Sequence, residues 1–307
     1  MLCGSIYMQL RRGQDATIWW QLFAEKWAWQ NVCYGFAALL LMPVNWGLEA
    51  AKWQKLAILL VPLSFADAFK GVLVGTAMAL FTPNRVGEYG GRIYLLPSAA
   101  ISWQAAALLL AGNICQLIIN LSVGLLGFLI FWHFHGFLDH KVLFLLTTST
   151  LLTVLALQFA YHFRASLAVF GARFPKMQRY CQPLLIWQHI NTSLWLQLLG
   201  VSLLRYGVYV LQCYYLLCFT NIAVAPALVL FSAIVAMFFV QTIAPSIAIF
   251  ELPIKGNIAL FFFSYVTDKS HSIALVVLLL WGINLALPAL VGGAILTQER
   301  QKDSSHK

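Results

Sequence analysis

The feature that most constrains this chain is its long runs of apolar residues, of which residues 103–132 are the clearest. These 30 residues include no Asp, Glu, Lys or Arg. A lipid bilayer has a hydrocarbon core about 30 Å thick, which an α-helix crosses with about 20 apolar residues. A run of this length therefore predicts a helix that spans a membrane.

Composition extends this prediction to the whole chain. Of the 307 residues, 61% are hydrophobic and 9% are charged, whereas a soluble domain carries about 25% charged residues. This balance excludes a soluble globular enzyme, and it excludes a disordered chain, which needs low hydrophobicity. The net charge of +9 does not indicate a nucleic-acid binder, because the cations are scattered between apolar runs and form no solvated patch.

The remaining apolar segments predict an all-α integral membrane protein, a polytopic helix bundle of about six to eight spans. These segments are 28–46, 57–82, 103–132, 142–162, 193–219, 222–250, 258–266 and 272–296. We expect one transmembrane domain at 1–297 and a polar cytoplasmic tail at 298–307. The sequence leaves open whether residues 1–10 are the end of a first span.

Lys and Arg in the loops predict how the bundle is oriented. Loop 163–191 contains four cations and no acid, and the tail contains three cations, whereas loop 133–141 contains only Lys141. Cytoplasmic loops are enriched in Lys and Arg. We therefore expect loop 163–191 and the C-terminus to face the cytoplasm, and loop 133–141 to face outside.

Two segments break the apolar pattern in the same way. Each contains an apolar half-span, then a proline, then a glutamate: Pro83 with Glu88, and Pro245 with Glu251. A proline interrupts a helix, and paired interruptions in two halves of a chain point to a transporter binding site. We expect two re-entrant or broken helical hairpins. The alternative is two kinked spans with incidental charges near the interface.

These hairpins would belong to an inverted repeat with halves at 28–162 and 163–297. Charge inside or beside apolar runs is costly, so it marks functional candidates. Arginine matches phosphate geometry, and the glutamates could balance the arginines or bind a cationic headgroup or a proton. The alternative is a structural ion pair, such as Arg85 with Glu251. The candidate substrate-binding residues are Pro83, Arg85, Gly87, Glu88, Arg92, Arg205, Pro245 and Glu251.

Other charged and polar residues predict structural roles. Glu49 precedes Lys52 by three residues, which suits a helical ion pair at the membrane interface. Asp67 and Lys70 have the same spacing and predict a structural pair near the cytoplasmic side. The histidines of loop 133–141 are irregularly spaced and indicate a solvated turn. We expect no metal, no other cofactor and no catalytic residues.

The stretch GTAMALFTPNRVGEYGGR at 75–92, preceded by NWGLEAAKWQKL at 45–56, resembles the flippase-like family named for the transmembrane region of lysylphosphatidylglycerol synthase. The resemblance covers about 28–297. The second-half signature of the family places glycines where this chain has SIAIF, and the Asn expected before the first proline is absent. The residues that match the two signatures are Pro83, Arg85, Gly87, Glu88 and Arg92, then Pro245 and Glu251.

This resemblance implies a bacterial inner-membrane protein that moves phospholipids or lipid-linked molecules between leaflets. Its partners would be membrane lipids with anionic or phosphate-bearing headgroups, and a homodimer or partners from an envelope-lipid pathway remain open. The aminoacyl transferase of the full synthase is not expected here. Two alternatives stay open: a membrane enzyme acting on lipid phosphates or polyprenyl carriers, and an accessory subunit of such a pathway.

Overall fold

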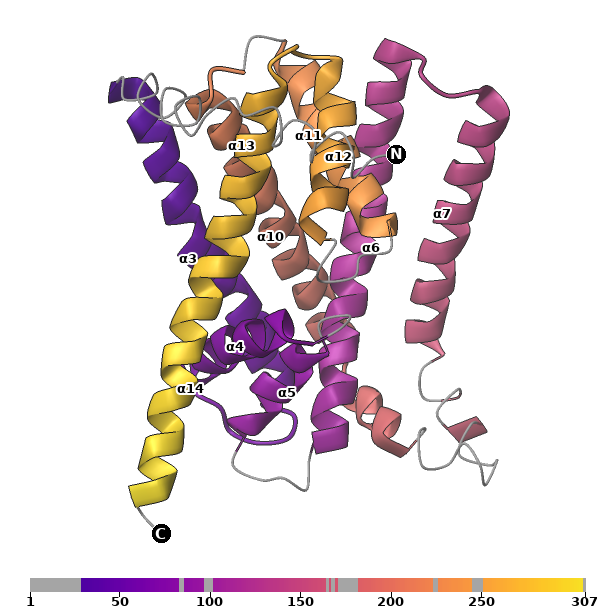
Figure 1. Ribbon diagram of the computed structural model, residues 1–307. Helices are drawn as coiled ribbons and strands as arrows, with labels where there is room; N and C mark the ends of the chain where they lie inside the picture. Colours follow the sequence, from indigo (N-terminus) through magenta and orange to yellow (C-terminus); the bar gives the residue numbers. More distant parts are fainter. Residues whose placement is uncertain are drawn as a thin grey trace.

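The computed structural model describes residues 29–82, 86–96, 102–163, 166, 169–170, 182–222, 226–244 and 251–305, and this part of the chain is helical and without strands (Figure 1). The prediction of an all-α membrane bundle is confirmed. Within these residues, five helical stretches are long and apolar enough to cross a membrane. They are α3 (Trp29–Ala57), α6 (Ser102–His135), α7 (His140–His162), α10 (Thr192–Phe219) and the continuous run of α13 (Ser270–Trp281), η5 (Gly282–Ala286) and α14 (Leu287–Ser305).

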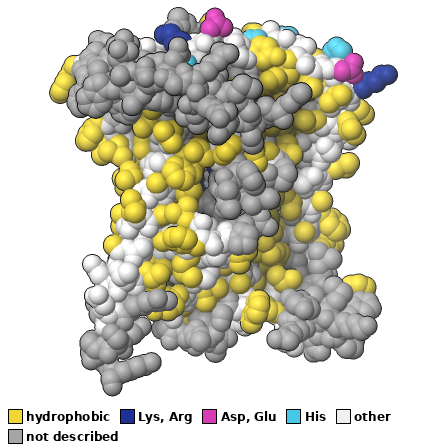
Figure 2. Space-filling view, in the orientation of Figure 1, with side chains coloured by type: hydrophobic (Ala, Val, Ile, Leu, Met, Phe, Trp, Pro, Cys, Tyr) yellow, Lys and Arg dark blue, Asp and Glu magenta, His cyan; other side chains and the backbone are white. Residues whose placement is uncertain are grey.

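The outer surface of the bundle is the kind that a lipid environment favours. Large exposed hydrophobic side chains occur on each of these five stretches, including Phe36, Leu126, Leu155, Leu204 and Leu290. In Figure 2 the described side chains over the middle of the visible face are hydrophobic or uncharged, and charged and histidine side chains lie along its upper edge. The chain is therefore a multi-pass membrane protein.

Local sequence sets the ends of several long helices. Asn191 accepts a hydrogen bond from the Leu194 backbone N–H and begins α10, as an N-cap residue does. The backbone leaves α6 through Gly136, whose φ of 57° is the left-handed conformation that glycine adopts without strain. The short turn before α7 then ends at Asp139, which accepts a hydrogen bond from the Lys141 N–H.

The α3 helix is longer than the sequence predicted. It runs through Pro43 to Ala57, so residues 47–56 continue the span instead of forming an interfacial segment. Glu49 and Lys52 are an ion pair as predicted, but both are buried inside the protein and do not lie at an exposed interface. The helix can bury the Glu49 carboxylate because Arg92 and Arg205, which lie on other helices, also pair with it.

Two helical hairpins are present, as predicted. One consists of α4 (Phe65–Leu80) and α5 (Gly87–Tyr94), and the other of α11 (Ala227–Ile243) and α12 (Glu251–Ser264). The longest of these helices has 17 residues, which is about 25 Å at 1.5 Å per residue and too short for a bilayer core. Figure 1 places α4 and α5 at the lower end of the bundle and α11 and α12 in its upper half.

Helix packing follows the pattern that an inverted repeat produces. The first helix of each hairpin packs against the long helix that follows the other hairpin: α4 against α14, and α11 against α6. Glycine permits both approaches, since Gly127 contacts Val235 of α11 and Gly292 lies on the backbone of Leu73 in α4. The α3 and α10 helices also pack closely together. The division into halves at residues 162 and 163 stays a prediction.

The ends of the bundle agree with the predicted grouping of the loops. The end of α7, the short helix η3 (Gln182–His189) and the C-terminal end of α14 all lie toward the lower end of the bundle in Figure 1, on opposite sides of it. The turn between α6 and α7 lies at the opposite end. Loop 163–191 and the tail therefore leave the bundle at the same end, and the assignment of that end to the cytoplasm remains a prediction.

Candidate functional site

A buried carboxylate, that of Glu49 in α3, joins three helices. The Glu49 Oε1 atom accepts a hydrogen bond from Arg92 Nη1 at 2.8 Å, and its Oε2 atom lies 2.8 Å from Lys52 Nζ and 2.7 Å from Arg205 Nη1. Arg92 also pairs with Glu88, one helical turn earlier in α5. We call these five residues, Glu49, Lys52, Glu88, Arg92 and Arg205, the charge cluster. It connects α3, α5 and α10.

The charge cluster is shielded from the bundle surface to different degrees. Glu49, Lys52 and Arg92 are 1–3% exposed, whereas Arg205 is 15% exposed. Buried charges need opposite charges and hydrogen bonds to offset the loss of hydration. Three cations face two carboxylates here, so the cluster retains one positive charge.

Close packing of α4 and α5 brings Arg92 into this cluster. A Cβ atom on Gly75 would lie 2.7 Å from the Glu88 carbonyl oxygen, and one on Gly91 would overlap the Gly75 backbone. The two helices can therefore touch only because both positions lack side chains. The Thr82 hydroxyl stabilises the N-terminal end of α5, because it accepts a hydrogen bond from the Gly87 N–H at 2.7 Å. These contacts hold the two helices of the hairpin close together.

A chain of buried amides continues from the charge cluster into the upper half. Arg205 Nε donates to Asn45 Oδ1 at 2.9 Å, and Asn45 Nδ2 donates to Asn284 Oδ1 at 3.1 Å. Asn284 donates in turn to Gln212 Oε1 at 2.8 Å, and Gln212 donates to the Ala38 carbonyl oxygen at 2.8 Å. Asn284 lies in η5, a π-helical turn of a kind that often marks functional sites. These bonds link α3, α10 and η5.

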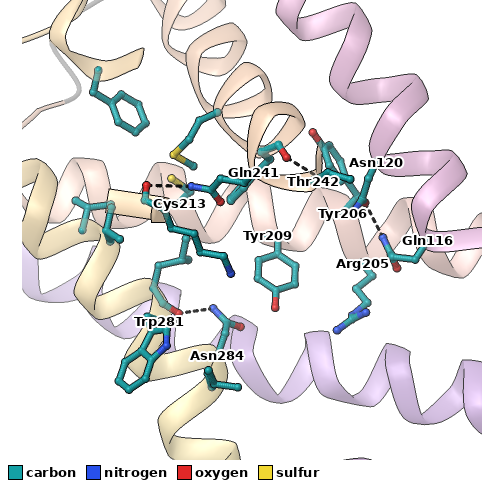
Figure 3. A pocket seen from close by; sticks show the side chains of 18 residues that line it. Gln116, Asn120, Arg205, Tyr206, Tyr209, Cys213, Gln241, Thr242, Trp281 and Asn284 are labelled. Carbon is teal, nitrogen blue, oxygen red and sulfur yellow. Dashed lines mark hydrogen bonds between the residues drawn. The ribbon is translucent and has the colours of Figure 1, made fainter. Parts of the chain in front are cut away.

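A cavity of about 290 Å³ lies beside these hydrogen-bonded amides (Figure 3). It is enclosed between the second hairpin and the helices that pack against that hairpin. In this view Tyr209 stands between Arg205 and Asn284. The wall comes from α6, α10, α11, α12, α13 and η5. Its polar and charged lining residues are Gln116, Asn120, Arg205, Tyr206, Tyr209, Gln241, Thr242, Lys255, Trp281 and Asn284.

The cavity wall is suited to an anion. It contains two cations, Arg205 and Lys255, and its described lining residues include no Asp or Glu. The buried Tyr206 hydroxyl has no hydrogen-bond partner among the described residues, and neither has Gln116 Oε1. A buried polar atom without a partner is costly, so a ligand that bonds to these atoms would be stabilised. Within the described part of the chain no cluster of His, Cys, Asp or Glu could hold a metal ion.

The structure unites some of the predicted site residues and leaves others untested. Glu88, Arg92 and Arg205 meet in the charge cluster, although only Arg205 also lines the cavity. Gly87 begins α5 and is packed against α4. Glu251 begins α12, and its side chain lies outside the described part of the structure. The predicted residues that lie outside the described ranges are Pro83, Arg85 and Pro245.

Sequence reasoning missed the residues that connect the site. The sequence predicts that Glu49 and Lys52 form an interfacial pair, and it does not mark Asn45, Lys255 or Asn284 as site residues. A signal was available for three of them, because Asn45, Glu49 and Lys52 recur at helical spacing on one face of an otherwise apolar helix. Polar residues on one face of a membrane helix usually face the bundle interior.

Asp67 and Lys70 form the predicted pair, with a 3.7 Å separation and about half of each side chain exposed. They lie at the start of α4 and contribute nothing to the cavity lining. Comparison with known proteins adds no identity to this geometry: no protein-family model, no curated protein and no solved structure matches the chain.

Proposed function

We propose that this protein is a transporter that moves an anionic phospholipid or lipid-linked molecule between the leaflets of a bacterial inner membrane. The observation that carries the proposal is the central cavity, which holds Arg205 and Lys255 and has no acid among its described lining residues. A cavity of that kind inside a bundle of membrane-spanning helices lowers the free energy of an anionic headgroup at bilayer depth.

The energetics of lipid exchange explain why such a cavity is useful. A lone charge at the centre of a bilayer costs at least about 2.5–3.5 kcal/mol. Arg205 offers a planar guanidinium that matches phosphate geometry, and Lys255 offers a point charge. Together with the Tyr206 and Tyr209 hydroxyls they replace the water that a headgroup loses. A volume of about 290 Å³ suits a headgroup and leaves the acyl chains in the bilayer.

The arrangement of the hairpins also supports transport. Hairpins that enter from opposite ends are a recurrent design in transporters, whose substrate site lies near the bilayer midplane between the repeats. The second hairpin contributes Gln241, Thr242 and Lys255 to the cavity wall, so its movement would change access to the site. The resemblance of residues 28–297 to the flippase-like family points in the same direction.

Leaflet exchange in liposomes tests this proposal. Purified protein should accelerate the exchange of fluorescent phosphatidylglycerol more than that of fluorescent phosphatidylcholine, and the Arg205→Met and Lys255→Met variants should lose most of the acceleration. Lys55→Met is the matched control, since Lys55 bonds to Gln197 and is not a lining residue of the cavity. Equal acceleration by all four proteins would refute the proposed site. Conversion of the lipid into a new product without exchange would favour a membrane enzyme.

A further inference from the structure

We infer that Arg205 changes partner when the substrate binds: its guanidinium leaves the Glu49 carboxylate for the anionic group of the ligand and returns when the ligand departs. Glu49 is then a positioning residue that competes with the substrate for Arg205. This inference rests on the proposed transport function. It assigns to Glu49, which touches no substrate, control over the affinity for the substrate and over the rate of substrate release.

Glu49 can release Arg205 without becoming an unpaired buried charge. Among the described residues it has three cationic partners: its Oε1 atom is bonded to Arg92, and its Oε2 atom is shared by Lys52 and Arg205. An isolated buried carboxylate would be strongly destabilising. When Arg205 leaves, Lys52 still occupies Oε2 and Arg92 still occupies Oε1, so the carboxylate remains neutralised.

Arg205 is the cation of the charge cluster that is free to exchange. Lys52 and Arg92 are 2% and 3% exposed and are not among the lining residues of the cavity, whereas Arg205 is 15% exposed and forms part of the cavity wall. Arg92 is additionally held by Glu88. The ligand can therefore reach the guanidinium of Arg205 and not the other two cations.

The surroundings of Arg205 let it move over a short distance and remain stabilised. Its Nε atom is anchored to Asn45 at 2.9 Å, so the stem of the side chain keeps its direction. The guanidinium lies 5.6 Å from the ring centroid of Trp46 and 5.8 Å from that of Tyr209. Aromatic faces attract cations at such distances. These two rings stabilise the guanidinium during its transfer from the Glu49 carboxylate to the anionic group of the ligand.

The charge balance of the cluster identifies the class of ligand. Three cations and two carboxylates leave one positive charge in the charge cluster, which Arg205 presents to the cavity. A phosphate-bearing group with one negative charge would neutralise this excess. A cationic group would increase the repulsion. The ligand is therefore recognised through its phosphate, which either a lipid headgroup or free phosphate could supply.

Two variants separate partner exchange from a merely structural role. Lys52→Met removes the competitor of Arg205 for Oε2, so Glu49 should hold Arg205 more firmly. The double variant Glu49→Gln with Lys52→Met removes one negative and one positive charge, which keeps the net charge of the cluster unchanged and leaves Arg205 without its carboxylate. The first change should weaken anion binding and the second should strengthen it.

The measurement is calorimetric titration of the purified full chain in phosphatidylcholine nanodiscs. The probes are water-soluble dihexanoyl phosphatidic acid and, separately, inorganic phosphate. We expect Lys52→Met to raise the Kd for the lipid probe about tenfold and the charge-matched double variant to lower it about tenfold, as close charge pairs alter affinity. Dissociation from the double variant, followed by stopped flow, should slow by a similar factor.

The possible outcomes are distinguishable. Weaker binding by both variants, or unchanged binding by both, would show that Glu49 only supports the fold and would overturn the inference. Wild-type protein that binds neither probe would overturn the proposed function itself. Loss of binding in Arg205→Met is required, and unaltered binding there would overturn the inference and leave transport to Lys255. Equal affinity for inorganic phosphate and the lipid probe would refute the lipid substrate and still support partner exchange.

Discussion

The two hairpins have corresponding places in the fold but differ in chemistry. The α4–α5 hairpin is fixed to the bundle by Arg92, which pairs with Glu49 in α3, and by the close approach of Gly292 in α14 to the Leu73 backbone in α4. None of its described residues lines the cavity. The α11–α12 hairpin contributes Gln241, Thr242 and Lys255 to the cavity wall and packs its apolar side, including Phe239, into the core.

This difference indicates that similar packing does not give the hairpins the same task. Buried ion pairs and backbone contact make the first hairpin an anchor, whereas amide, hydroxyl and ammonium groups make the second one a wall of the candidate site. The link between them is Arg205, which contacts Glu49 on one side and the cavity on the other. Substitutions in the two hairpins can therefore separate anchoring from ligand binding.

Replacing Arg92 should have the largest effect on stability. Arg92→Met leaves Glu88 without its partner and removes one of three cations from buried Glu49, and loss of one member of a buried ion pair costs about 3–5 kcal/mol. Thermal unfolding in detergent, followed by circular dichroism, measures the loss. Lys255→Met is the matched change in the second hairpin and should reduce transport with little change in stability. Equal destabilisation by both variants would contradict the division of tasks.

A single methyl group should have opposite effects in the two hairpins. Gly91→Ala places a Cβ atom against the Gly75 backbone, and overpacking of this kind costs about 1–3 kcal/mol or more. A Cβ atom on Gly256 in α12 meets nothing within 4 Å, so Gly256→Ala should stabilise that helix by about 0.5–1 kcal/mol. The unfolding temperatures of the two variants decide the matter, and a decrease for Gly256→Ala would show that α12 packs more tightly than described.

Two tyrosine hydroxyls provide a finer comparison. The Tyr89 hydroxyl in α5 accepts a hydrogen bond from Asn113 at 2.8 Å, so Tyr89→Phe should cost about 0.5–1.5 kcal/mol of stability. The Tyr206 hydroxyl at the cavity has no partner among the described residues. Tyr206→Phe should therefore leave stability unchanged or slightly raised and weaken binding of dihexanoyl phosphatidic acid several-fold. A calorimetric titration with unchanged affinity would remove Tyr206 from the site.

The exposed pair at the start of α4 should matter least. Asp67 and Lys70 are 3.7 Å apart and about half exposed, and exposed pairs of this kind contribute about 0–1 kcal/mol. Asp67→Asn should lower the unfolding temperature slightly, and the Ser64 hydroxyl, which donates to the Asp67 carboxylate at 2.6 Å, can still bond to the new amide oxygen. High salt should erase the difference from wild type. A loss as large as that of Arg92→Met would mean that the pair is buried by a partner.

Much of the architecture could be predicted from local patterns. Apolar runs identified the spans, because the bilayer thickness fixes how many apolar residues a helix needs. Proline followed by glutamate identified both hairpins, since proline interrupts a helix. Arg205 was identified because a cation inside the apolar run 193–219 requires a partner. These inferences depend only on neighbours along the chain.

The partners of those charges could not be predicted. Arg92 bonds to Glu49 across 43 positions of sequence, Arg205 to Asn45 across 160 and Asn45 to Asn284 across 239. The i,i+3 spacing of Glu49 and Lys52 made a local pair the simplest interpretation, and that pair does form. Spacing carries no information about the two arginines that approach Glu49 from other helices.

Hydrophobic patterning alone indicates a multi-pass helical bundle with two interrupted segments and a few charged residues within or beside apolar runs. These properties follow from hydrophobicity and backbone chemistry, which act over one helix at a time. The packed fold was needed to show that Glu49 is the centre of the buried charges, that the second hairpin lines the cavity and that Arg205 contacts both Glu49 and the cavity. Those relations depend on which helix faces pack together, and packing is settled by close contacts between residues distant in the chain.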